Sequence, residues 1–195
     1  MEETGQADDT IVIYTSDHGE MMGSHGRMGK EPPFEESCHV PFFIRIPRAT
    51  KRGGSSKELF ASVDLFPTLC GLAGIPIPKQ CVGRDMSQVM AGGKAAPTKG
   101  VILMADRGGA SIAENDMPSY RGIRTDTHTY AVIEDGRWVL YDNVADLFQL
   151  RNLATDPAHK SLMGKLDEQI VAWQQSVGDT FDLKKAAQHI SSYPS

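Results

Sequence analysis

The chain has 195 residues, of which 40% are hydrophobic and 23% are charged, and its formal net charge is −5. This length and composition are typical of one large globular domain, or of a domain with a small appendage. Mild acidity without a run of Lys or Arg argues against a nucleic-acid partner. No apolar stretch reaches the roughly 18–20 residues that span a bilayer, so no membrane segment is expected. The polar, acidic first nine residues predict no signal peptide, which leaves the compartment open.

The cysteine count also limits the class of protein. Cys38, Cys70 and Cys81 are odd in number, and none of them forms a Cys-x-x-Cys pair. A disulfide scaffold or a structural zinc site needs paired, regularly spaced cysteines. The sequence therefore predicts three free thiols.

The first half of the chain carries two apolar strand patterns joined by a loop that contains several glycines. Residues 10–15 are apolar and rich in β-branched side chains, which predicts a buried strand. A short turn at 34–38 precedes a second strand at 40–46, and an exposed loop follows at 51–56. Two helices are expected after it, one over 64–74 with Asp64 as its N-cap and one over 85–91.

The second half has the pattern of a small antiparallel sheet. Its four expected strands lie at 100–105, 119–124, 129–134 and 137–141, and Asp-Gly at 135–136 predicts a hairpin turn. A helix over 158–177 should pack on these strands with one apolar stripe. The stripe consists of Leu162, Leu166, Ile170, Trp173 and Val177.

Residues able to bind a metal and an anion lie just after the first strand. Asp17 and His18 stand at its carboxyl end, where open α/β sheets bind ligands. A carboxylate suits Ca²⁺, Mg²⁺ or Mn²⁺, and an imidazole suits Mn²⁺ or Zn²⁺. Lys30 could hold an anionic oxygen, and His25 could orient a leaving group or act as a general acid. The alternative is that all four are ordinary strand-end and surface residues, as expected for Glu35.

Several segments, taken in order, resemble the sulfatase family of the alkaline-phosphatase superfamily, over about residues 8–177. They are residues 10–30, 34–44, 63–69, 73–75, 83–85, 121–126, 140–142 and 152–157. The resemblance implies an α/β fold: the C-terminal part of an alkaline-phosphatase-like α/β/α sheet domain, followed by a small antiparallel four-stranded sheet with a C-terminal helix. Residues 1–95 would be that sheet domain with half of the metal site, 96–177 the sheet-and-helix subdomain, and 178–195 a weakly patterned tail.

The resemblance also implies roles for the loop residues. Asp17 and His18 would be two ligands of a divalent cation, and Lys30 would hold an oxygen of the substrate sulfate. Ca²⁺ is the expected ion. Mn²⁺ is the alternative, because in having a histidine at position 18 the chain resembles the choline sulfatases and phosphonate monoester hydrolases of the family. The family hydrolyses sulfate esters with a formylglycine nucleophile.

One family feature is absent from the sequence. The formylglycine forms in a Cys/Ser-x-Pro/Ala-x-Arg segment, and residues 1–195 contain none. The family's first-strand acidic ligands are absent too. The sequence therefore predicts a truncated sulfuric ester hydrolase that is inactive alone, with a sulfate ester as the parent enzyme's substrate. Alternatives are a phosphonate monoester or phosphodiester hydrolase, and a non-catalytic interaction module. The exposed sheet of a severed domain would favour a homo-oligomer.

Overall fold

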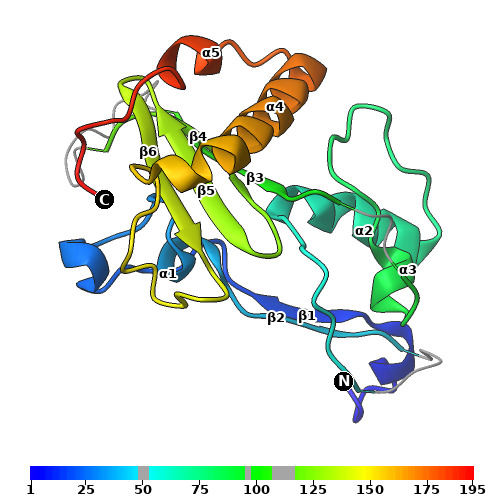
Figure 1. The fold of residues 1–195 in the computed structure, drawn as a ribbon. Coiled ribbons are helices and arrows are strands. Elements are labelled where there is room, and N and C mark those ends of the chain that lie inside the picture. The colour runs from blue at the N-terminus through cyan, green and yellow to red at the C-terminus, as the bar shows by residue number, and fades with distance from the viewer. Residues whose placement is uncertain (48–52, 95–97, 107–116) are drawn as a thin grey trace. The chain divides into compact units, whose positions relative to one another are not determined.

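The computed structural model describes residues 1–47, 53–94, 98–106 and 117–195, which form two compact units (Figure 1). Unit 1 comprises Met1–Asp17 and Val40–Thr98, and unit 2 comprises His18–His39 and Lys99–Ser195. The boundary predicted near residue 95 and the first part of the predicted loop at 51–56 lie outside the described residues. Residues 18–39, which the sequence grouped with the first half of the chain, pack within unit 2.

Unit 2 is built on a four-stranded antiparallel sheet of order β3-β4-β5-β6 (Figure 1). The structure confirms the predicted sheet and its hairpin. The hairpin turn itself is one residue earlier than expected, because Gly136 already opens the last strand with φ of +147°. The strands are β3 (Val101–Ala105), β4 (Tyr120–Arg124), β5 (His128–Ile133) and β6 (Gly136–Asp142).

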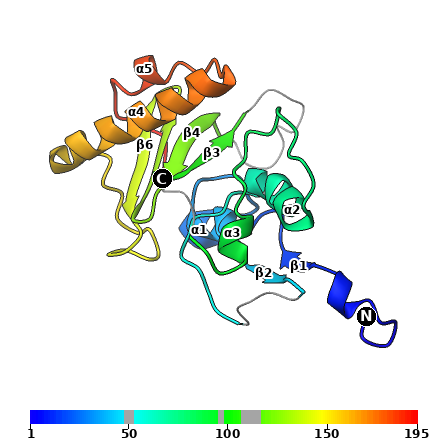
Figure 2. The same cartoon turned by 90° about the vertical axis from the view of Figure 1, so that its right-hand side faces the viewer.

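The long helix α4 (Lys160–Val177) lies across one face of this sheet, as the sequence predicts (Figure 2). Its central buried residues are Leu166 and Ile170, which join a hydrophobic cluster with Tyr130 of β5. The predicted stripe is rotated at its C-terminal end, where Gln174 is buried and Val177 is 40% exposed. Burial of Gln174 costs little because its amide is hydrogen-bonded within the unit.

The opposite face of the sheet is covered as well. Alternate residues of a strand point to opposite faces, and most strand residues of a second cluster alternate with those of the first. Trp138 is the exception, and it lies at the irregularity in the pairing of β5 with β6. This cluster includes Met21 and Phe34 from the loop segment 18–39, together with residues of three strands. The segment that carries the candidate site is therefore part of the hydrophobic core of unit 2. The strand residues in this cluster are Tyr120, Ala131, Ile133, Trp138, Val139 and Tyr141.

The weakly patterned segment 178–195 also belongs to unit 2. It contains the short helix α5 (Leu183–Ala186), whose two end residues are buried in the first cluster. Further on, Ile190 forms an isolated β-bridge with Arg137. Few apolar residues suffice here because the segment extends an existing core.

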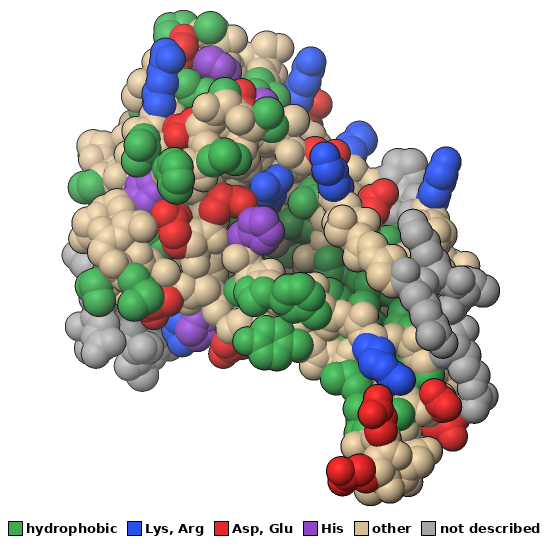
Figure 3. Space-filling view, turned by 90° about the horizontal axis from the view of Figure 1, so that it is seen from below, with side chains coloured by type: hydrophobic (Ala, Val, Ile, Leu, Met, Phe, Trp, Pro, Cys, Tyr) green, Lys and Arg blue, Asp and Glu red, His purple; other side chains and the backbone are tan. Residues whose placement is uncertain are grey.

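Unit 1 contains an antiparallel two-stranded ribbon of β1 (Val12–Thr15) and β2 (Phe42–Arg45). The prediction of a buried first strand is wrong, since Tyr14 is 67% exposed and its cross-strand partner Phe43 is 65% exposed. Each strand has one neighbour within the described residues, so the ribbon cannot bury both of its apolar faces. Hydrophobic side chains lie at the surface in the space-filling view (Figure 3).

The helices of unit 1 are α2 (Leu65–Ala73) and α3 (Ser87–Met90). Asp64 is the N-cap residue of α2, as predicted, but its side chain makes no capping hydrogen bond to the helix. Its buried carboxylate accepts hydrogen bonds from the Ala61 amide at 3.1 Å and from the Arg84 amide and guanidinium, each at 2.7 Å. Asp64 therefore joins two segments about twenty residues apart, which sequence spacing does not reveal.

All three cysteines are free thiols, as predicted. None of the helices in the described residues has the length and apolar character needed to cross a membrane.

Candidate metal and anion site

His18 and Lys30 are brought together in unit 2, twelve residues apart in the sequence. The Lys30 Nζ lies 2.9 Å from His18 Nε2, and His18 Nδ1 lies 2.7 Å from the Gly19 carbonyl oxygen. An ammonium only donates and a carbonyl only accepts. These two contacts together require the tautomer in which Nδ1 carries the hydrogen and the Nε2 lone pair faces Lys30.

Asp17 directly precedes His18 and is the last residue of the first segment of unit 1. Its side chain is exposed, and its Oδ1 accepts a hydrogen bond from Ser16 Oγ at 3.3 Å. Within the described residues, no group of three or more His, Cys, Asp or Glu side chains is arranged to hold a metal ion. Asp17 and His18 are therefore at most part of a ligand set.

Close packing against α1 (Glu35–Cys38) fixes the start of the loop. The Gly19 amide donates to the Ser37 carbonyl at 2.8 Å, and the Glu20 amide donates to the Glu36 carbonyl at 2.9 Å. A Cβ on Gly19 would stand 1.8 Å from the Glu36 carbonyl oxygen. Only glycine allows the backbone next to His18 to approach the helix this closely.

Polar contacts tie α1 in turn to the four-stranded sheet. The Glu35 carboxylate makes a two-pronged ion pair with the Arg124 guanidinium at 3.1 and 3.2 Å, and the Glu35 amide donates to the buried Gln149 side chain at 2.9 Å. The Tyr120 hydroxyl donates to the Glu31 carbonyl at 2.9 Å. Glu35 is thus a structural partner. This role of Glu35 cannot be predicted from spacing, because Arg124 and Gln149 are 89 and 114 residues away in the sequence.

His25 lies in an aromatic stack. Its ring is parallel to that of Phe34, with 4.1 Å between centroids, and its backbone has φ of +54°. Nε2 is buried and has no hydrogen-bond partner within the part of the chain that the structure describes. The role of His25 as a general acid stays a prediction.

Cys38 is the last residue of α1 and is the thiol nearest in sequence to His18 and Lys30. Burial, reinforced by the charge of Glu35, raises the pKa of this thiol to about 11. At neutral pH Cys38 is therefore protonated and a poor nucleophile.

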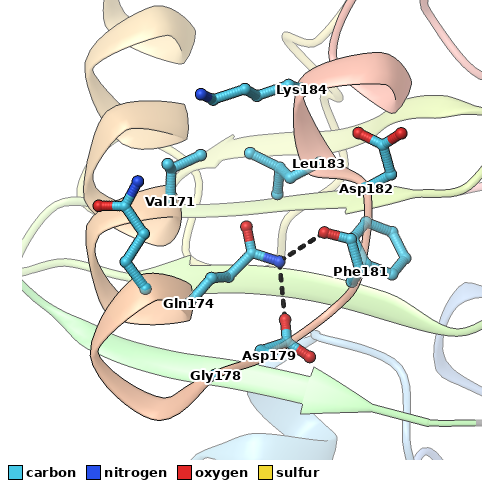
Figure 4. A pocket seen from close by; sticks show the side chains of 9 residues that line it. Val171, Gln174, Gly178, Asp179, Phe181, Asp182, Leu183 and Lys184 are labelled. Carbon is cyan, nitrogen blue, oxygen red and sulfur yellow. Dashed lines mark hydrogen bonds between the residues drawn. The ribbon is translucent and has the colours of Figure 1, made fainter.

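A separate groove of about 300 Å³ lies beside α4 and α5 (Figure 4). Its central polar group is Gln174, whose amide nitrogen donates to Asp179 and to the Phe181 carbonyl, each at 2.7 Å. The Asp179 carboxylate also accepts two hydrogen bonds from the Arg121 guanidinium. These contacts hold the groove's polar groups within the fold.

Comparison with known proteins identifies the family. The family model described as Sulfatase matches residues 1–75. The chain is 34% identical over 184 residues to the ulvan-active sulfatase of Formosa agariphila, covering 93% of this chain and 36% of that protein. The chain belongs to the sulfatase family of the alkaline-phosphatase superfamily.

Solved structures agree with this membership. One is a protein in complex with its substrate D-glucosamine-2-N,6-O-disulfate, with a TM-score of 0.83 and 26% identity over 94% of this chain and 38% of that one. Another is the phosphonate monoester hydrolase of Agrobacterium radiobacter, with a TM-score of 0.75 and 26% identity over 90% of this chain and 37% of that one. The α/β fold predicted from the sequence is confirmed. The chain spans little more than a third of these relatives.

Proposed function

We propose that this chain carries part of the active site of a metal-dependent sulfuric ester hydrolase. In this proposal Asp17 and His18 are ligands of a divalent cation, and Lys30 holds an anionic oxygen of the substrate. The observation that carries the proposal is the 2.9 Å contact between Lys30 Nζ and His18 Nε2 in a chain of the sulfatase family.

The tautomer of His18 supports its role as a ligand. Histidines that bind metals commonly donate their other ring N–H to a carbonyl or carboxylate, and His18 Nδ1 has the Gly19 carbonyl as acceptor. Nε2 then presents a lone pair, and Asp17 adds hard carboxylate oxygens that suit Ca²⁺ or Mn²⁺. When bound, such an ion would polarise the sulfuryl oxygens and stabilise negative charge on them.

The position of Lys30 supports the second half of the proposal. Its ammonium is a compact point charge that donates up to three hydrogen bonds. A cation at His18 Nε2 would compete for the lone pair that now accepts from Lys30. Lys30 would then be available to an anion beside the ion, which is the charge distribution of a sulfate monoester site.

We expect the isolated chain not to hydrolyse sulfate esters, because residues 1–195 contain no Cys/Ser-x-Pro/Ala-x-Arg segment in which a formylglycine could form. Two protein ligands should also bind a divalent cation only weakly, since most of the ion's hydration shell would remain. Appreciable hydrolysis of an aryl sulfate by the pure chain, abolished in Asp17→Ala, would contradict this expectation.

Ligand assignment can be tested on the chain itself by NMR with Mn²⁺ as a paramagnetic probe. We expect sub-stoichiometric Mn²⁺ to broaden the His18 ring signals selectively, and Asp17→Asn to weaken that broadening. The exposed His189 ring is the internal control, and competition with Ca²⁺ compares the two ions. Equal broadening of His18 and His189 would refute the assignment.

A second candidate is hydrolysis of phosphonate monoesters or phosphodiesters. It is favoured by the structural similarity to the Agrobacterium radiobacter phosphonate monoester hydrolase. Both substrate classes present anionic oxygens to a cation and a lysine, so the described residues do not separate them. The two classes can be separated by comparing rates with matched aryl sulfate and aryl phosphonate esters on a longer form of the protein that has the nucleophile segment. A preference for the phosphonate would replace the sulfatase assignment.

A further inference from the structure

We propose that Arg27 is a positioning residue that holds the loop between His18 and Lys30 in place by binding the segment Ser191–Pro194. This inference rests on the proposed function only in taking His18 and Lys30 as the site. It concerns the conformation of the loop, which can be measured without catalysis.

One backbone carbonyl makes the central contact. The Pro194 oxygen accepts hydrogen bonds from Arg27 Nη2 at 2.7 Å and from Trp138 Nε1 at 3.0 Å. Residue 27 is 167 positions from Pro194 in the sequence, and Trp138 is buried in the second hydrophobic cluster. The carbonyl therefore links the loop, the sheet and the C-terminal segment at a single point.

Two aromatic rings surround the Arg27 charge. Its guanidinium carbon lies 5.9 Å from the centroid of the Trp138 ring and 5.6 Å from that of Tyr193, and the two rings are 5.5 Å apart at nearly right angles. Arg27 Nε is buried without a hydrogen-bond partner in the described ranges. Cation–π attraction compensates in part for this desolvation, so the position favours arginine.

The C-terminal segment has its own fixed place on the sheet. The Arg137 amide donates to the His189 carbonyl at 3.0 Å, and the Ser191 amide donates to the Arg137 carbonyl at 2.8 Å. A Cβ at Gly136 would stand 2.7 Å from the Ser191 nitrogen. The glycine that opens β6 thus admits the segment, and Arg27 binds to a support anchored in the core.

From Arg27 the loop's own hydrogen bonds lead to the site. The Gly23 amide donates to the Arg27 carbonyl at 2.8 Å, and the Met21 amide donates to the Gly29 carbonyl at 2.7 Å. Met21 is 1% exposed, and Gly29 directly precedes Lys30. Release of Arg27 should therefore loosen the turn that sets the position of Lys30 relative to His18.

The test is amide hydrogen exchange combined with ¹⁵N NMR of the His18 ring, on the whole chain with Arg27→Gln, Arg27→Lys and Tyr193→Ala. For Arg27→Gln we expect exchange at Met21 and Gly23 to rise about 10- to 100-fold, through loss of a charge-assisted hydrogen bond and the ring contacts. The β5 amides should keep their rates. The chemical shift of His18 Nε2 should change as Lys30 moves away. Arg27→Lys keeps the positive charge, so its changes in exchange and in chemical shift should be smaller than those of Arg27→Gln. The matched control is Arg151→Gln at an exposed loop arginine.

The inference is overturned if exchange rises equally in β5, since Arg27 would then act only on global stability. It is also overturned if neither the loop amides nor the His18 shift responds. Tyr193→Ala changes the support without altering the loop sequence, and should give the same direction of change. Failure of Mn²⁺ to select His18 would refute the proposed ligand assignment and leave these exchange results unaffected.

Discussion

The two units differ in how far each completes its own core. Unit 2 buries both faces of its sheet, one under α4 and α5 and the other under the loop segment 18–39. Unit 1 has a ribbon of two strands on which Tyr14 and Phe43 are about two-thirds exposed. The same kind of apolar strand sequence therefore gives a closed core in one unit and an open surface in the other.

This difference shows what an apolar run specifies. It specifies that a strand needs partners on both faces, and the partners must come from elsewhere in the protein. In unit 2 they come from segments before and after the sheet. Four substitutions test this difference between the units, and they follow in order of their expected effect on stability.

The largest effect is expected for Asp179→Asn in unit 2. Its carboxylate is paired with the Arg121 guanidinium at 2.7 Å, and the Arg121 side chain is 4% exposed. Breaking the pair leaves the buried Arg121 charge with only the exposed Asp106 carboxylate, 3.7 Å away, as a charged partner. We therefore expect a loss of about 3 kcal/mol in the free energy of unfolding, measured by urea denaturation. Asp126→Asn at an exposed site is the control, and an equal loss there would contradict the assignment.

The pH dependence of the same variant gives a second check. Hydrogen bonding to Arg121 holds the pKa of Asp179 below its ordinary value of 3.8. The contribution of this carboxylate is therefore complete above pH 3.8 and is lost as the pH falls through the lower folded-state pKa. The stability difference between wild type and Asp179→Asn should shrink on acidification below that pH. A stability difference that grows below pH 3.8 would contradict the lowered pKa of Asp179.

A smaller loss is expected for Asp64→Asn in unit 1. The variant weakens a buried hydrogen-bond acceptor, while the Arg84 side chain, 31% exposed, can recover some contact with water. We expect a loss of about 1–3 kcal/mol in the free energy of unfolding, with Asp8→Asn as the exposed control. A larger effect than that of Asp179→Asn would mean that the less complete unit depends more on its polar contacts.

Gly19→Ala tests the close approach that positions the loop. The added Cβ would meet the Glu36 carbonyl at 1.8 Å, so the backbone next to His18 has to move. We expect a cost of about 1–3 kcal/mol from this overpacking and faster hydrogen exchange at Gly19 and Glu20. The control is Gly164→Ala in α4, where an added Cβ meets nothing within 4 Å. This substitution should be neutral or stabilising.

The smallest effect on unfolding is expected for Tyr14→Ser, within about 0.5 kcal/mol, because the side chain is already exposed. Its main effect should be on association. If the open ribbon joins two copies of the chain, sedimentation velocity should show less dimer in the variant. An unchanged monomer fraction at every concentration would exclude the ribbon as a self-association surface.

The sequence alone is enough to predict the local features. It predicted the four antiparallel strands, the hairpin before β6, the long helix on the sheet and the free thiols, because each depends on periodicity, turn residues or composition. The order of its motifs also identified the sulfatase family. Residue type and position predict roles for Asp17 and His18 at a strand end and for His25 and Lys30 in the loop that follows, and these roles stay predictions.

Which distant segments meet depends on tertiary packing. Glu35, predicted to be a surface charge, is held by Arg124 and Gln149. The carbonyl and the two aromatic rings that contact Arg27 come from residues more than a hundred positions away. The exposure of Tyr14 likewise could not be predicted from the apolar residues around it. Spacing along a chain predicts contacts within a helix or hairpin, whereas contacts between segments depend on how the cores close.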